Sequence, residues 1–175
     1  ALCRDIRLIF ASTDIEEDIL TSTDFDTAFL QSSKFKDQRL MLIIYKDIFT
    51  GEDVYEYING VIYGMQTGGH EWKETLCYRA TTEMGFKELK NMESMYYNPV
   101  KKVTMAVHVD DPLVKSTGIE NREWFHDTLE EKFDTKGRRY LTETNPMDYI
   151  SVRVSMTPNK DVCMDNIERI EEYLK

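Results

Sequence analysis

Two acidic sites in the sequence differ from its other carboxylates because apolar residues surround them. Asp24 leads directly into the apolar-rich segment 25–30, and Asp110-Asp111 lies between two apolar, strand-like segments. Carboxylates held close together at the ends of buried strands repel one another and lose hydration, and a divalent cation relieves both effects. Their hard oxygens suit Mg²⁺, and two such ions about 4 Å apart support phosphoryl or nucleotidyl transfer. The alternative is a polar hairpin tip, because an Asp-Asp pair alone is a weak signal.

Other catalytic patterns are missing from the sequence. There are three histidines, no serine in a nucleophile-elbow pattern, and no glycine-rich phosphate loop or dinucleotide fingerprint. Cys3, Cys77 and Cys163 lack zinc-ligand or redox spacing. They are typical of reduced cysteines in an intracellular protein.

Composition restricts the classes of protein further. The 175 residues suit one domain, with room for a small appendage, at about 150 residues per domain. Hydrophobic residues make up 41% and aromatic residues 11%, which argues against global disorder. The longest apolar run, 40–45, is far shorter than the roughly 20 residues of a membrane span. The net charge of −10 disfavours a simple polybasic nucleic-acid binder.

Hydrophobic periodicity predicts the elements that position the two acidic sites. Segment 23–30 predicts a strand that turns into a helix or loop, and 103–114 predicts a β-hairpin with the two carboxylates at its tip. Apolar residues at steps of four predict two helices, one through Trp72, Leu76, Ala80 and Met84, the other through Phe125, Leu129 and Phe133.

The remaining segments complete an expected α+β fold. Residues 40–45 predict a short buried strand or one buried helical turn, and 149–156 predict a strand. Cys163, Ile167, Ile170 and Leu174 predict a closing helix. Together these elements predict a mostly antiparallel sheet with helices packed on one face.

The order of motifs along the chain resembles that of copia-type retrotransposon reverse transcriptases. Segment 23–31, which carries Asp24, is similar to the family's first catalytic motif. Segments 62–66, 85–87 and 108–111 follow in the family's order, and 129–133 is similar to its downstream segment. The resemblance runs over nearly the whole chain.

This resemblance implies an RNA-directed DNA polymerase with an antiparallel-sheet palm domain. Residues 1–140 would form the palm-like domain without most of the fingers, and 141–175 the closing strand and helix that begin a thumb- or connection-like segment. The reaction would be attack of a primer 3′-hydroxyl on the α-phosphate of a deoxynucleotide. The implied partners are an RNA or DNA template-primer and a deoxynucleoside triphosphate.

The resemblance also implies roles for particular residues. The catalytic and Mg²⁺-binding carboxylates would be Asp24, Asp110 and Asp111. The nucleotide-binding residues would be Phe25, Phe29, Tyr63 and Gly64, with Phe29 under the sugar as a steric gate. The structural alternatives are core packing for Phe29 and an ordinary turn for Tyr63-Gly64.

Several residues depart from the family's pattern. Pro112 directly follows the Asp pair, His108 replaces a tyrosine, and Asp26 replaces a lysine. Segment 68–70 replaces the family's usual Ser-Pro-Arg, and segment 149–151 replaces its usual Phe-Leu-Gly.

These departures keep two further hypotheses open. One is a degenerate, non-catalytic domain that serves as a structural subunit and binds a protein partner. Its candidate anchors are Tyr55, Tyr57, Tyr96 and Trp124. The other is an unrelated acidic α+β binding module.

Overall fold

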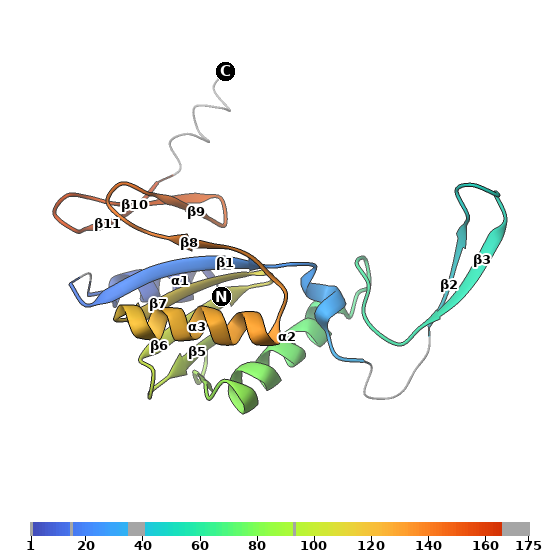
Figure 1. Ribbon diagram of the computed structural model, residues 1–175, viewed down its shortest axis with the longest axis horizontal. Helices are drawn as coiled ribbons and strands as arrows, with labels where there is room; N and C mark the ends of the chain where they lie inside the picture. The colour runs from blue at the N-terminus through green and yellow to red at the C-terminus, as the bar shows by residue number, and fades with distance from the viewer. Residues whose placement is uncertain (1, 15, 35–40, 93, 166–175) are drawn as a thin grey trace, which may run out of the picture.

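A six-stranded antiparallel sheet forms the centre of the molecule (Figure 1). The computed structural model describes residues 2–14, 16–34, 41–92 and 94–165. The strand order is β4-β5-β6-β7-β1-β8. These strands are β1 (Asp18–Phe25), β4 (Lys87–Glu88), β5 (Met95–Asn98), β6 (Val103–His108), β7 (Asp111–Thr117) and β8 (Thr135–Tyr140). The expected α+β class with a mostly antiparallel sheet is confirmed.

Both faces of the central sheet are covered. One face carries α2 (Gly68–Tyr78), its π-helical extension η2 (Arg79–Glu83) and α3 (Ile119–Lys132). The opposite face carries α1 (Leu2–Ala11) and a three-stranded sheet of β9 (Met147–Tyr149), β10 (Val152–Met156) and β11 (Val162–Asp165). Neighbours on β7 show the alternation, since Val114 packs in the first layer and Leu113 in the second. The helices therefore do not all lie on one face, because α1 packs behind the sheet.

The two predicted amphipathic helices form the first layer. Trp72, Leu76, Ala80 and Met84 are all buried, although the last two lie on or after the π-helical turn. At the centre, the ring of Phe25 makes edge contacts with Trp72 at 5.0 Å and Phe133 at 5.1 Å. These aromatic contacts fix α2 and the end of α3 against the end of β1. None of the helices in the described part of the chain is long and apolar enough to cross a membrane.

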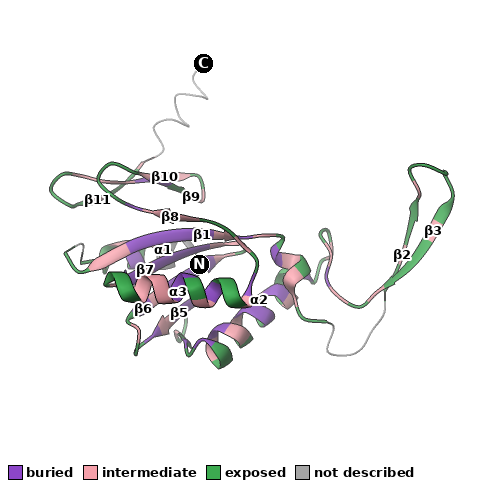
Figure 2. Cartoon of the chain, viewed as in Figure 1, coloured by how far each residue is buried: buried purple, intermediate pink, exposed green. Residues whose placement is uncertain are grey.

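The strand predicted at 40–45 forms but is not buried. β2 (Met41–Lys46) pairs with β3 (Asp53–Ile58), and the hairpin projects from the body of the molecule (Figure 2). Most of its large apolar side chains are exposed, including the two at the tip, Ile48 and Phe49. The expectation of burial was wrong because, among the described residues, no second layer packs on this hairpin.

Two predictions near the C-terminus need correction. Segment 149–156 is a hairpin rather than one strand, because Ile150 and Ser151 have φ of 48° and 65° and form the turn between β9 and β10. Cys163 lies in strand β11 and not in a helix. The other residues of the predicted closing helix, Ile167, Ile170 and Leu174, lie outside the described residues.

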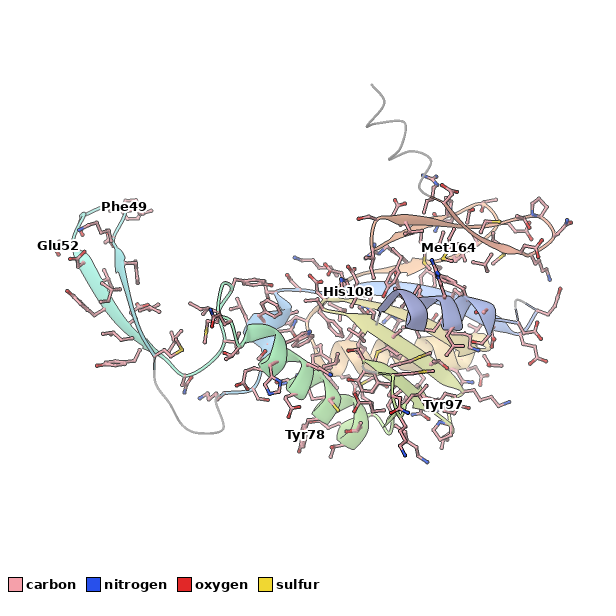
Figure 3. All side chains as sticks on the ribbon, turned by 180° about the vertical axis from the view of Figure 1, so that it is seen from behind. Phe49, Glu52, Tyr78, Tyr97, His108 and Met164 are labelled. Atoms are coloured by element: carbon pink, nitrogen blue, oxygen red, sulfur yellow. The ribbon has the colours of Figure 1, made fainter. Side chains whose placement is uncertain are left out.

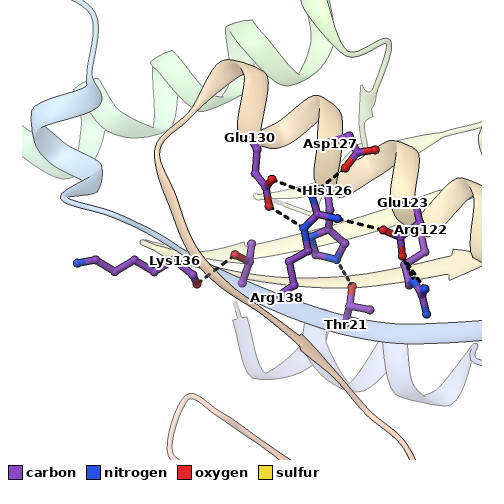
Figure 4. A network of polar contacts seen from close by, with 9 residues as sticks. Thr21, Arg122, Glu123, His126, Asp127, Glu130, Lys136 and Arg138 are labelled. Atoms are coloured by element: carbon purple, nitrogen blue, oxygen red, sulfur yellow. Dashed lines mark hydrogen bonds and ion pairs between the residues drawn. The ribbon is translucent and has the colours of Figure 1, made fainter.

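A polar network ties α3 to the edge strand β8 and to β1 (Figure 4). The Arg138 guanidinium donates hydrogen bonds to Glu130 and Asp127 at 2.7 Å and to Glu123 at 3.0 Å. Beside it, His126 Nε2 lies 3.0 Å from Thr21 Oγ1. Burial, with a smaller contribution from the Arg138 charge, lowers the pKa of His126 to about 4. The network fixes the position of β8 with a neutral imidazole in the core.

The lowered pKa of His126 predicts a loss of stability in mild acid. In the unfolded chain the His126 imidazole takes up a proton near pH 6.5, whereas in the folded chain it stays neutral until about pH 4. The free energy of unfolding therefore falls as the pH drops from 6.5 toward 4. We expect this residue to account for about 2 kcal/mol of unfolding free energy lost by pH 5. Urea unfolding of His126→Gln at pH 7.5 and pH 5 measures this loss, with exposed His70→Gln as the matched control. Equal pH dependence in wild type and His126→Gln would contradict it.

Candidate active site

The end of β1 meets the tip of the β6–β7 hairpin through the backbone. His108 pairs with Asp111, which leaves Val109 and Asp110 as the two-residue turn. The Phe25 N–H donates a hydrogen bond of 2.8 Å to the Asp110 carbonyl. Asp24, one residue before Phe25, therefore lies beside the turn. The predicted hairpin with carboxylates at its tip is present, and it lies against the strand that carries the third carboxylate.

α2 holds this turn in an unfavourable backbone conformation. Val109 has a φ of 55°, in the left-handed region that β-branched residues rarely adopt. The indole N–H of Trp72 donates a hydrogen bond of 2.5 Å to the Val109 carbonyl. Because Trp72 is itself buried in the aromatic cluster, the core fixes the turn.

Pro112 is accommodated at the hairpin, although it removes a backbone donor. It pairs with Val107 across the β6–β7 ladder. On the other side of β7, the register with β1 ends at the pair Ser22 and Leu113, and Leu113 is the residue that follows Pro112. A strand residue without an N–H cannot continue that ladder. The backbone contact between the strands resumes where Phe25 meets Asp110.

The three predicted catalytic carboxylates lie within electrostatic reach of one another. Burial, and then repulsion from Asp110, raise the pKa of Asp24 above its usual value. Burial and the Asp110 charge likewise raise the pKa of Asp111, and Asp24 adds to that shift. The site therefore concentrates negative charge at one end of the sheet.

Two cationic side chains on β8 face these carboxylates, and the sequence interpretation missed both. Lys136 stands opposite Asp24 in the β1–β8 register, and its Nζ lies 2.5 Å from Asp26 Oδ1. Arg139 Nη2 lies 3.5 Å from Asp111 Oδ1. The available signal was the segment 136–139, in which three of four residues are basic in an otherwise acidic chain.

The predicted nucleotide-binding residues separate into two groups. Phe25 is 1% exposed and packs in the core, on the opposite side of β1 from Asp24, so its side chain is not at the site. Phe29 is half-buried, and its ring centroid lies 5.1 Å from that of exposed Tyr63. Gly64 follows with a φ of 90°, which glycine adopts readily. Tyr63 lies within electrostatic range of Lys136, the residue opposite Asp24, which relates this aromatic pair to the carboxylates.

The chemistry of the donors fits Mg²⁺, whereas their arrangement is not a ready-made metal cage. Three carboxylates supply the hard oxygens that this ion prefers, and their mutual repulsion favours a cation between them. Yet no group of three or more His, Cys, Asp or Glu side chains in the described ranges is arranged to hold a metal ion. The positive charges that face the carboxylates are those of Lys136 and Arg139.

Comparison with known proteins gives a structural likeness only. No family model matches the sequence, and no curated protein matches it. Among solved structures, apo telomerase from Candida tropicalis, truncated from its C-terminal domain, has a TM-score of 0.56 at 9% identity. The likeness covers 94% of this chain. The chain therefore shares the fold of the matched part of that telomerase.

The likeness covers only part of each neighbour. This chain spans 38% of the Candida tropicalis telomerase chain. A second structure, Candida albicans telomerase in complex with a fragment of telomeric RNA, has a TM-score of 0.47 and 10% identity. That likeness covers 93% of this chain and 33% of the neighbour.

Because its pKa is raised, Asp24 is expected to destabilise the metal-free fold at neutral pH. Asp24→Asn should raise the Tm at pH 7 by about 1–2 °C, and the gain should shrink in acid as the wild-type carboxyl becomes protonated. Differential scanning calorimetry in EDTA measures the shift. Asp26→Asn, which removes the ion pair with Lys136, is the control and should not stabilise. A lower Tm for Asp24→Asn would contradict the repulsive role.

Proposed function

We propose that this chain carries the nucleotidyl-transfer site of an RNA-directed DNA polymerase of the copia type. One observation carries the proposal: the end of β1 and the β6–β7 hairpin bring Asp24, Asp110 and Asp111 to one end of the sheet, in a fold similar to part of a telomerase. In this proposal residues 1–140 form the palm-like part, and 141–175 begin the thumb- or connection-like segment. The partners are an RNA or DNA template-primer and deoxynucleoside triphosphates.

The chain's own residues have distinct tasks in this reaction. The primer O3′ forms a bond to the α-phosphorus of the nucleotide while the bond to pyrophosphate breaks. Asp24, Asp110 and Asp111 would hold Mg²⁺, which when bound neutralises the phosphate charge and lowers the pKa of the attacking hydroxyl. Phe29 and Tyr63 offer adjoining rings against which the sugar and base can pack. Phe29 is then the residue that would exclude a 2′-hydroxyl.

Primer extension on an RNA template with Mg²⁺ tests the proposal directly. Asp110→Asn should lower the extension rate at least about 100-fold, because the site loses one of its charged ligands. The exposed carboxylate Asp161, far from the hairpin in sequence, gives the control Asp161→Asn, which should extend like wild type. Absence of extension by the wild-type chain, or equal rates for both variants, would count against a working polymerase site.

A second candidate function follows from the β2–β3 hairpin. A two-stranded hairpin is marginally stable alone, yet this one presents Leu42, Ile44, Tyr55 and Tyr57 on one exposed face. Its tip also presents Phe49, which Figure 3 shows beside Glu52 at the far end of the molecule. Exposed apolar surface of this kind marks protein interaction sites. The alternative is therefore a non-catalytic subunit that docks a protein partner through this hairpin.

Of the four side chains predicted to anchor a protein partner, two are exposed and two are packed into the fold. Tyr55 and Tyr57 point outward, as an anchor requires. Tyr96, however, is fully buried, and Trp124 packs against the core with its ring 6.3 Å from that of Phe86. An interaction surface therefore belongs on the hairpin rather than on the body of the fold.

Matched substitutions distinguish the hairpin from other exposed apolar residues. Ile44→Lys with Tyr55→Lys should release the chain from any larger assembly that it forms in its own cells, measured by size-exclusion chromatography with light scattering. Ile119→Lys with Tyr78→Lys is the control, because these side chains are 61% and 60% exposed against 59% and 62%. Both double variants should keep the wild-type Tm, since none of the four side chains supports the core. Release by both, or by neither, would argue against docking through the hairpin.

A further inference from the structure

We propose that Arg139, assisted by Lys136, is the resident counter-ion of Asp24 and Asp111 and competes with a divalent cation for the carboxylate site. This inference rests on the proposed metal site and specifies how the metal-free form is stabilised. It assigns a function to two cations of β8 that the polymerase chemistry above does not use.

Arg139 connects the carboxylate site to the three-stranded sheet. Its Nη2 lies 3.5 Å from Asp111 Oδ1, and its Nη1 donates a hydrogen bond of 3.2 Å to the Asp148 carbonyl in β9. The neighbouring Tyr149 hydroxyl donates a hydrogen bond of 3.0 Å to the Asp111 backbone carbonyl. Asp111 is thus ion-paired with Arg139 of β8, which also binds the β9 backbone, and its own carbonyl accepts a hydrogen bond directly from β9.

Lys136 acts on Asp24 from a more exposed position. It stands opposite Asp24 in the ladder, and its ammonium reaches Asp26 rather than Asp24. Its side chain is 62% exposed against 41% for Arg139, so water screens its charge more strongly. Arg139 is therefore the stronger counter-ion of the two.

Because the counter-ion is an arginine, the charge with which it affects metal binding does not depend on pH. A guanidinium does not lose its proton at accessible pH, so the positive charge of Arg139 stays at the site. A divalent ion that approaches Asp111 must either displace this guanidinium or bind beside it against repulsion. Removing the charge should therefore strengthen metal binding, although it removes a contact that supports the metal-free fold.

Mn²⁺ alone is the probe, and electron paramagnetic resonance of the free ion measures its dissociation constant. We expect Arg139→Gln to bind Mn²⁺ about fivefold more tightly than wild type, because one positive charge leaves the site. Arg7→Gln, an exposed arginine on α1, is the control and should match wild type. In EDTA, Arg139→Gln should melt below wild type, and saturating Mn²⁺ should remove that difference.

The other outcomes separate this inference from the proposed function. Wild-type binding that is abolished by Asp110→Asn but unchanged or weakened by Arg139→Gln would overturn the counter-ion role and leave the metal site standing. No Mn²⁺ binding by wild type or by Arg139→Gln would overturn both. Should Arg139→Gln fail to fold, Lys136→Gln serves instead. We expect it to bind Mn²⁺ more tightly than wild type, by a smaller factor than Arg139→Gln. Unchanged or weaker Mn²⁺ binding would overturn the inference.

Discussion

The hydrogen bond from the Phe25 N–H to the Asp110 carbonyl is the contact on which the candidate site depends. It joins the end of β1 to a two-residue turn more than eighty positions later in the chain, and it uses only backbone atoms. Once β1 pairs with β7, the register leaves no other place for Asp24 than beside the turn. Three carboxylates then share one end of the sheet, and their repulsion must be compensated nearby.

Much of the surrounding structure serves that compensation. Trp72 anchors the carbonyl of strained Val109, so the core determines the shape of the turn. Arg138 binds α3 through three carboxylates and thereby fixes β8, the strand that brings Lys136 and Arg139 to the acidic end. The same short basic segment thus supplies one structural cation and two that face the site. In an otherwise acidic chain, this one strand therefore places two positive charges near the carboxylates.

The body and the β2–β3 hairpin place different physical demands on a partner. The body encloses two apolar layers and directs its charges to a defined site. The hairpin exposes apolar faces and carries mostly acidic charges, which disfavours contact with a phosphate backbone. The proposed catalysis and the proposed docking therefore concern separate regions of the chain, and each can be tested without disturbing the other.

The sequence by itself determined the elements whose evidence is local. Apolar residues at every fourth position identified α2 and α3 and their buried side chains, because periodicity reports which face of an element is buried. The β-branched segment before Asp110 identified the hairpin. The sequence also singled out Asp24, Asp110 and Asp111, since carboxylates among apolar residues are unusual. Local patterns did not reveal that β2 is exposed or that Phe25 faces away from Asp24 into the core.

Only the tertiary structure decided what surrounds the carboxylates. β1 and β8 are far apart in sequence, with Thr23 and Lys136 separated by 113 residues, so no local pattern shows that Lys136 and Arg139 meet the acidic end. The split of 149–156 into a hairpin rests on two residues of positive φ and on the pairing of β9 with β10, neither of which the alternation of the sequence shows. Periodicity records which face of an element is buried, whereas long-range strand pairing sets which charges become neighbours, and the chemistry of this site depends on those neighbours.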